Sequence, residues 1–128
     1  MATRGVRGAT TADENDAVHI AARTLELLRI LVELNGIRPE DLASATFTLT
    51  EDLDAEFPAT PVRSLAGWEG VPLLCAREIP VAGSLARCIR VLLHWNTEKA
   101  QREVRHAFLR RARALRPAWA VRVPGDGE

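Results

Sequence analysis

Hydrophobic residues recur along this chain at two different spacings, and each spacing predicts its own kind of element. From Val18 to Val32, apolar residues return every three or four positions, the period of a helix with one buried face. These residues are Val18, Ala21, Ala22, Leu25, Leu28 and Val32. Thr11 followed by Glu14 matches an N-terminal capping box, and Asn35-Gly36 is typical of a left-handed C-terminal cap. The pattern predicts one long amphipathic helix between these signals.

Other segments have the character of strands. Residues 44–50 alternate between apolar Ala45, Phe47 and Leu49 and polar serine and threonine, which predicts a half-buried strand. Two apolar runs, 71–77 and 87–95, flank a linker of Pro, Gly and Ser and predict strand, connection, strand. Residues 2–7 predict a short first strand that ends at Gly8.

Shorter signals complete the chain. Thr60-Pro61 predicts a short helix that ends at Gly67. The local propensity of residues 98–115 favours one basic helix, which Pro117 would end. Residues 118–128, which contain Pro and Gly near their end, predict a mobile C-terminal tail.

These elements predict an α+β fold with α/β-like character, in which a mixed β-sheet packs against one long helix and several short helices. A chain of 128 residues is expected to form a single domain, which we assign to residues 1–117. One long helix leaves the second face of the sheet uncovered. We therefore expect that face to be buried between subunits.

The composition is that of an ordinary globular chain, with 47% hydrophobic and 27% charged residues and a formal net charge of zero. Its basic residues are sixteen Arg and the single Lys99, which favours planar donors suited to carboxylates. No segment has the pattern of a secretory signal or a membrane span. Two cysteines without ligand spacing predict neither a disulfide framework nor a metal site. We expect a cytoplasmic protein without metal.

Arg90 is the most informative polar residue because it lies inside an apolar run, between Ile89 and Val91. A guanidinium in such a strand needs an anionic partner, since an unpaired buried charge costs several kcal/mol as an order of magnitude. Glu78, three residues after Cys75, lies at the end of the preceding run. An internal salt bridge to Glu78 and a bound anion would both meet this requirement.

Five motifs occur in an order that resembles the small trimeric, monofunctional chorismate mutases. They are Arg4-Gly5-Val6-Arg7-Gly8-Ala9-Thr10-Thr11, Phe57-Pro58-Ala59 with Arg63 following, Cys75 with Glu78, Cys88-Ile89-Arg90-Val91, and Leu115-Arg116-Pro117. The resemblance runs from Met1 to Pro117. It implies a homotrimer that forms a pseudo-α/β-barrel, with active sites at the subunit interfaces. It also implies a short helix to about residue 104 and a strand over 108–113.

The resemblance further implies an isomerase of aromatic amino-acid biosynthesis that converts chorismate to prephenate by a pericyclic Claisen rearrangement. Such a site needs electrostatic preorganisation but no covalent intermediate, metal or cofactor. The implied catalytic residues are Arg90, Glu78, Arg7 and Cys75. The implied substrate-binding residues are Phe57, Ala59, Thr60, Arg63, Leu73, Leu74, Phe108, Leu115 and Arg116. Phe108 departs from the family pattern, which usually has a tyrosine there.

Two other functions fit parts of the sequence. Trimeric imine or enamine deaminases share this general fold and also hold a substrate carboxylate with an arginine, so the fold alone does not decide the activity. If residues 102–116 were helical, their arginines would form a basic stripe able to bind nucleic acid. The zero net charge argues against that binding module, and we expect neither a nucleic-acid nor a membrane partner.

Overall fold

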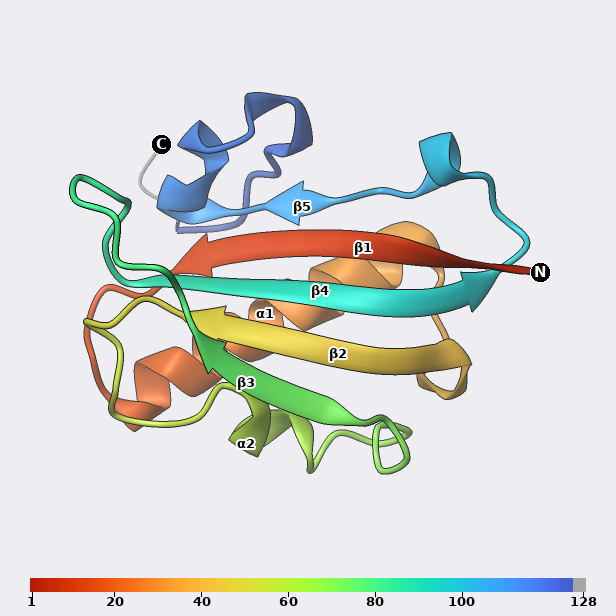
Figure 1. Cartoon of the computed structure of the whole chain (residues 1–128), viewed down its shortest axis with the longest axis horizontal. Coiled ribbons are helices and arrows are strands. Elements are labelled where there is room, and N and C mark those ends of the chain that lie inside the picture. Colours follow the sequence, from red (N-terminus) through yellow and green to blue (C-terminus); the bar gives the residue numbers. More distant parts are fainter. Residues whose placement is uncertain (126–128) are drawn as a thin grey trace.

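The computed structural model describes residues 1–125, which form a five-stranded mixed sheet backed by one long helix (Figure 1). The strands are β1 (Ala2–Thr11), β2 (Leu42–Leu49), β3 (Leu73–Arg77), β4 (Cys88–Thr97) and β5 (Ala107–Phe108). The helices are α1 (Ala17–Asn35) and α2 (Ala59–Val62), with 3-10 turns at Pro39–Asp41, Gln101–Glu103, Arg110–Ala114 and Pro117–Trp119. This architecture confirms the predicted α+β fold.

The sheet has the order β3-β2-β4-β1-β5. The central strand β4 runs antiparallel to β1 and β2, whereas the outer pairs, β2 with β3 and β1 with β5, are parallel. α1 connects β1 to β2 and lies behind the sheet in Figure 1. Within residues 1–125, no helix covers the opposite face (Figure 1).

Alternation in β2 and β4 sets the two faces of the sheet. Ala45 and Phe47 of β2 are fully buried on the α1 side, together with Val91 and Leu93 of β4. The intervening residues of both strands are half-buried and lie on the open face. The predicted half-buried strand at 44–50 is therefore confirmed, and in the structure it begins two residues earlier, at Leu42.

β1 is longer than predicted, because Gly8 does not end it. Gly8 pairs with Val91 on one side and Ala107 on the other, and the strand continues to Thr11. A Cβ atom at residue 8 would lie 2.8 Å from Leu31 Cδ1 and 3.0 Å from Leu27 Cδ1. The absence of a side chain at Gly8 thus allows α1 to pack directly on the strand. Gly8 therefore serves helix packing and does not end the strand.

The long helix occurs where it was predicted and ends at Gly36, which has a left-handed φ of 68°. Its start was predicted wrongly. Thr11 is engaged in β1, and Asp16 caps the helix by accepting from the His19 backbone N–H at 2.7 Å.

The buried face of α1 was also shifted from the predicted one. Val18 is 76% exposed, and the buried residues are Ile20, Thr24, Leu27, Leu28, Leu31 and Asn35. Two of these residues, Thr24 and Asn35, are polar, and the side chain of each donates a hydrogen bond to a main-chain carbonyl. Thr24 Oγ1 donates to the Ile20 carbonyl at 2.8 Å, and Asn35 Nδ2 donates to the Leu31 carbonyl at 2.9 Å. A pattern counted from apolar residues alone included Leu28 but missed the two polar members of this face.

The segment after β4 differs from both predictions made for it. The expected short helix near residue 104 is a 3-10 turn, Gln101–Glu103. The expected strand over 108–113 is limited to Ala107–Phe108, because Arg110 adopts a left-handed φ of 53° and turns the chain into the 3-10 turn Arg110–Ala114. A continuous basic helix over 98–115 does not form.

Residues 117–125 follow β5 and lie against the core. The Val121 N–H donates to the Phe108 carbonyl at 2.9 Å, Trp119 packs near Phe108, and Val123 is 6% exposed. Residues 126–128 of the predicted mobile tail lie outside the described residues. Mobility of the tail 118–128, and the domain boundary at residue 117, stay predictions.

Candidate functional site

The open face of the sheet carries a pocket of about 310 Å³, built from three neighbouring strands. It is lined by Arg7 of β1, Thr46 and Thr48 of β2, Val91, Leu92 and Arg90 of β4, and Glu78. Its volume is at the lower end of the range for small-molecule sites. Three of the four predicted catalytic residues, Arg7, Glu78 and Arg90, therefore line one pocket.

The strand register explains why these side chains meet. Arg90 is paired with Ala9 on one side and with Thr48 on the other, and Leu92 is paired with Arg7. Side chains of directly paired residues point to the same face of a sheet. Arg7 and Arg90 consequently project from adjacent strands onto the face that α1 leaves open.

The charged contacts inside the pocket leave Arg90 only partly satisfied. Its Nε lies 3.7 Å from Glu78 Oε2, and both side chains are about one quarter exposed. Thr48 Oγ1 donates to that same Glu78 oxygen at 2.5 Å. The buried Nε of Arg90 has no hydrogen-bond partner within residues 1–125. The internal salt bridge exists as a charge contact but leaves a buried donor available for an anion.

Arg7, the second arginine of the pocket, lies among more positive than negative charges. Burial lowers the pKa of the Arg7 guanidinium, and the charges of Arg90 and Arg116 lower it further, while Glu78 opposes them. Three guanidiniums against one carboxylate leave a surplus of two positive charges around the pocket. That surplus suits a ligand with two negative charges.

The C-terminal segment forms one side of this region. Arg116 Cζ lies 3.7 Å from the centre of the Trp119 ring, and Leu115 is partly exposed. Phe108 is 1% exposed and packs with Ala9 and Ala112, so its ring lies beneath Arg7, 5.7 Å from the guanidinium. In the single chain, Phe108 therefore supports Arg7 from the core.

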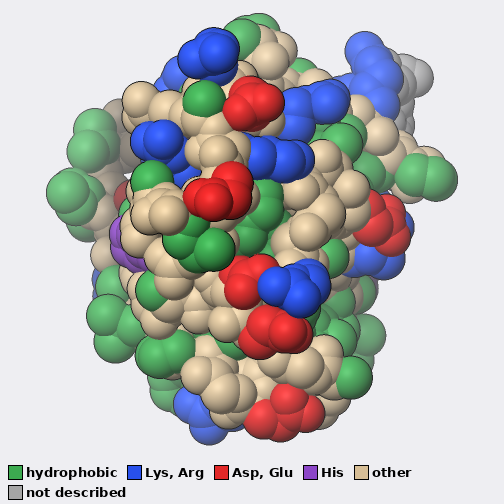
Figure 2. Space-filling view, turned by 90° about the vertical axis from the view of Figure 1, so that its right-hand side faces the viewer, with side chains coloured by type: hydrophobic (Ala, Val, Ile, Leu, Met, Phe, Trp, Pro, Cys, Tyr) green, Lys and Arg blue, Asp and Glu red, His purple; other side chains and the backbone are tan. Residues whose placement is uncertain are grey.

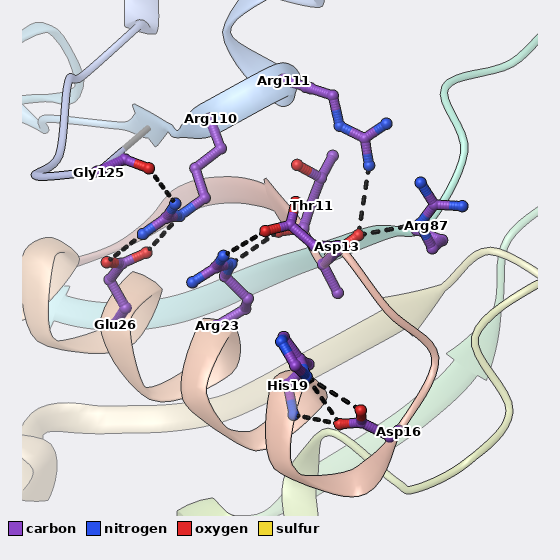
Figure 3. A network of polar contacts seen from close by, with 11 residues as sticks. Thr11, Asp13, Asp16, His19, Arg23, Glu26, Arg87, Arg110, Arg111 and Gly125 are labelled. Carbon is purple, nitrogen blue, oxygen red and sulfur yellow. Dashed lines mark hydrogen bonds and ion pairs between the residues drawn. The ribbon is translucent and has the colours of Figure 1, made fainter. Parts of the chain in front are cut away.

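An ion pair ties this segment to α1. Arg110 donates from Nε and Nη2 to the two carboxylate oxygens of Glu26, each at 3.0 Å (Figure 3). Arg110 also donates to the Gly125 carbonyl, and Arg111 reaches the Ala12 carbonyl at the end of β1 (Figure 3). These arginines are occupied by the fold and do not form a free basic stripe.

The remaining predicted residues lie apart from Arg7 and Arg90 in one chain. Cys75 pairs with Phe47, which directs its half-buried side chain to the α1 face, away from the pocket. It lines a separate hollow of about 400 Å³ with Phe57. Arg63 and Leu73 line a third hollow. The last three, Ala59, Thr60 and Leu74, belong to α2 or β3.

Sequence reasoning missed several residues of this region. Thr46 and Thr48 line the pocket, and the alternating pattern of β2 had placed them on its polar face without a role. His106 and Trp119 contact Arg7 and Arg116, and neither residue belongs to the predicted site. The contact of His106 with Arg7 joins segments 99 residues apart, which no local pattern contains.

No nucleophile emerges from the cysteines. Cys75 and Cys88 are both free thiols. Burial raises the pKa of the Cys88 thiol, although the Arg90 charge opposes the shift. A neutral buried thiol behaves as a small apolar side chain.

One group outside the pocket has a metal-like composition. The possible ligand atoms of Glu14, Asp16 and His19 lie within 4.8 Å of one another. Asp16 is already the cap of α1, and its Oδ1 contacts His19 Nδ1 at 2.9 Å. The hydrogen bond from the His19 backbone N–H, followed by that from its ring, lowers the pKa of Asp16. Helix capping accounts for this cluster.

A nucleic-acid-binding module would need basic side chains gathered on one face. In Figure 2, which shows the end of the molecule near Met1, acidic and basic side chains lie beside one another. Exposed ion pairs include Arg38 with Asp41 and the N-terminal ammonium with Glu98. None of the helices within residues 1–125 is long and apolar enough to cross a membrane.

Fold and pocket together define an α+β protein that carries a small pocket lined by Arg7, Arg90 and Glu78 on the open face of its sheet. The model of the family "Chorismate mutase type I" matches residues 3–119. Chorismate mutase AroH of Thermus thermophilus is 53% identical over 117 residues, covering 89% of this chain and 93% of that protein. Chorismate mutase AroH of Bacillus subtilis (strain 168) is 41% identical over 117 residues, covering 91% and 92%.

A solved structure agrees with these relatives. A chorismate mutase from Clostridium thermocellum superposes with a TM-score of 0.83 at 44% identity, covering 86% of this chain and 97% of that one. The chain therefore belongs to the type I chorismate mutase family, and its predicted assignment as an isomerase of this kind is confirmed. The deaminase alternative is set aside by the same matches.

Proposed function

We propose that this chain rearranges chorismate to prephenate in the pocket formed by Arg7, Glu78 and Arg90, without a covalent intermediate. The observation that carries the proposal is the unpartnered Nε of Arg90 within a pocket that has surplus positive charge. A dianionic substrate supplies both the missing acceptor and the missing negative charge. Donors fixed before the reaction stabilise developing charge without reorganisation.

Each residue has a proposed part in this reaction. Arg90 meets the ether oxygen that gains negative charge as its bond breaks, and also holds the neighbouring carboxylate. Arg7 binds a carboxylate from the adjacent strand. Glu78 accepts from the substrate hydroxyl and faces the ring that becomes partly positive. Thr48 donates to Glu78 and thereby keeps its carboxylate oriented.

The second wall of the site is proposed to come from a neighbouring subunit of a homotrimer. Within one chain, Cys75 and Phe57 line a different hollow from Arg7 and Arg90. Leu74, on the uncovered sheet face, is 64% exposed. Packing of this face against the β3 side of a neighbouring subunit, which carries Cys75 and Phe57, would remove the exposed apolar surface and bring the two residue groups together. Cys75, Phe57, Arg63 and Leu73 would then act across the interface.

The proposed setting is aromatic amino-acid biosynthesis in the cytoplasm. Both cysteines are free, which suits a reducing compartment. The substrate and product are small dicarboxylates, and the pocket faces them with guanidiniums. No proton transfer is required, so the chemical step is expected to be flat in pH across the neutral range.

The direct test is the loss of the ultraviolet absorbance of chorismate on addition of the purified chain, with prephenate identified as the product. Sedimentation equilibrium of the same sample is expected to give the mass of a trimer. A bell-shaped rate profile near neutral pH that moved on replacement of a histidine would contradict the mechanism. Absence of turnover by a folded trimer would contradict the activity itself.

A further inference from the structure

His106 and Trp119 connect the backbone of one site arginine to the side chain of another. The Arg7 N–H donates to His106 Nδ1 at 2.9 Å. The centre of the His106 ring lies 4.1 Å from that of Trp119. Trp119 in turn contacts Arg116, whose Cζ atom lies 3.7 Å from the centre of the indole ring. The order Arg7, His106, Trp119, Arg116 is thus an unbroken series of contacts.

The hydrogen bond to Arg7 replaces a main-chain contact at the edge of the sheet. The parallel pairing of β1 with β5 covers only Gly8 with Ala107 and Ala9 with Phe108. Arg7 lies one residue before this ladder, and the imidazole accepts its N–H instead. Because a backbone N–H can only donate, Nδ1 is the unprotonated nitrogen and the neutral ring carries its proton on Nε2. His106 therefore fixes the strand at the residue that bears the site guanidinium.

The aromatic contact acts on Arg116 in a comparable way. The 3-10 turn Pro117–Trp119 brings the indole under the guanidinium that precedes it by three residues. A guanidinium stacked on an indole gains a cation–π contact and samples fewer rotamers than one in open solvent. The contact orders Arg116 before a ligand arrives, so less conformational entropy is lost on binding.

The neutral state of the imidazole is supported by its charged neighbours. Burial lowers the pKa of His106, and the charges of Arg7 from β1 and Arg116 from the C-terminal segment lower it further. A proton on Nδ1 would remove the acceptor of the Arg7 N–H and add a third positive charge between two guanidiniums. The arrangement therefore works only with a neutral ring.

We propose that His106 and Trp119 are positioning residues, which hold Arg7 and Arg116 in the geometry that binds the two carboxylates of the substrate. The identity of that substrate rests on the function proposed above. The contacts of His106 and Trp119 do not depend on that function, so the role of His106 can also be tested by a measurement that does not require enzyme activity.

Two substitutions at residue 106 separate its two contacts. His106→Asn keeps an uncharged acceptor for the Arg7 N–H but loses the ring, whereas His106→Phe keeps a ring for Trp119 and loses the acceptor. Exchange of the Arg7 amide, followed by nuclear magnetic resonance, is expected to be at least tenfold faster in His106→Phe than in His106→Asn. The kcat for chorismate is expected to fall about tenfold in His106→Phe and to be restored by His106→Asn.

Trp119→Leu removes the platform under Arg116 without touching Arg7. We expect KM for chorismate to rise roughly fivefold to tenfold while kcat stays within about twofold, and Trp119→Phe to recover most of the loss. Trp95→Phe is the matched control, because Trp95 is buried on the α1 face of β4. It is expected to lower the melting temperature and leave KM unchanged, which separates positioning from general destabilisation.

Two results would overturn the proposal. One is wild-type exchange of the Arg7 amide in His106→Phe, and the other is an unchanged KM in a folded Trp119→Leu variant. If the wild-type chain fails to consume chorismate, the proposed function fails instead, and the amide exchange in His106→Phe still decides the role of His106.

Discussion

Arg90 Nε lies 3.7 Å from Glu78 Oε2, close enough for an ion pair and too far for a hydrogen bond. The same Glu78 oxygen accepts from Thr48 Oγ1 at 2.5 Å. Glu78 therefore orients toward β2, and the Arg90 donor stays unpartnered within residues 1–125. An unmade hydrogen bond at a buried charged donor is costly, so this relationship favours a ligand that supplies the acceptor.

Replacement of Arg90 is expected to act on turnover more than on folding. Arg90→Ala should lose on the order of a thousandfold in kcat, the cost of one donor aimed at developing charge. Arg90→Lys keeps the charge but loses the planar fork, so it should also be severely impaired. The measurement is kcat at saturating chorismate on protein shown to be folded by circular dichroism. Near-normal turnover of Arg90→Lys would remove Arg90 from the chemistry.

Subunit mixing should reveal which residues come from different chains. Arg7 and Glu78 line one pocket of one chain, whereas Arg63 lines another hollow. Exchange of subunits between Arg7→Ala and Arg63→Ala trimers should restore activity at part of the sites, measured at low chorismate concentration.

The matched control for that experiment is a mixture of Arg7→Ala with Glu78→Ala. Because both residues line the same pocket, no site of a mixed trimer would gain a complete set, and activity should not recover. Recovery in this control, or its absence with Arg63→Ala despite proven exchange, would contradict a site shared in the proposed way.

Gly8→Ala tests the close packing of α1 on β1. The new Cβ would meet Leu31 Cδ1 at 2.8 Å and Leu27 Cδ1 at 3.0 Å. Overpacking of this kind costs about 1–3 kcal/mol of the free energy of unfolding. Gly70→Ala is the control, because no atom lies within 4 Å of its added Cβ. Equal denaturation midpoints for the two variants in urea would refute the predicted packing constraint.

Glu26→Ala tests how the C-terminal segment is attached. The Arg110 and Glu26 side chains are 12% and 19% exposed, and removal of the carboxylate takes two of its hydrogen bonds from a mostly buried guanidinium. We expect a loss of roughly 1.5–3 kcal/mol in the free energy of unfolding.

The control for Glu26→Ala is Glu33→Ala, whose exposed pair with Arg29 has side chains 58% and 65% exposed. Such a surface pair contributes about 0.5 kcal/mol or less. Urea denaturation of both variants gives the comparison. Similar losses in the two would mean that the Arg110 contact does not hold the segment.

His106 should make stability depend on pH on the acid side of neutrality. Burial and then the charges of Arg7 and Arg116 lower its pKa below the ordinary value of 6.5. The unfolded chain therefore binds more protons in the window below 6.5, and stability falls as pH falls through the folded pKa. Urea titrations in this window should show a steeper decline for the wild type than for His106→Asn. Parallel curves would contradict the shift.

Local sequence determined the elements whose signals are themselves local. Alternation identified β2 because every second residue of that strand faces the core. Gly36 marked the end of α1 because glycine, which has no Cβ atom, adopts the left-handed backbone of a C-terminal cap without a steric clash. The position of Arg90 inside an apolar strand also indicated an anion requirement, because burial of a charge is costly wherever it occurs. The family followed from motifs spread along most of the chain.

The tertiary structure decided what depends on partners distant in sequence. Gly8 is an ordinary strand residue because α1 packs against it, and the buried stripe of α1 includes Thr24 because a main-chain carbonyl satisfies it. Arg110 turns the chain away from a strand, held by Glu26, which lies 84 residues away. The link between Arg7 and His106, 99 residues apart, exists only once β5 lies beside β1. Such contacts are set by the register of the sheet, which no single segment encodes.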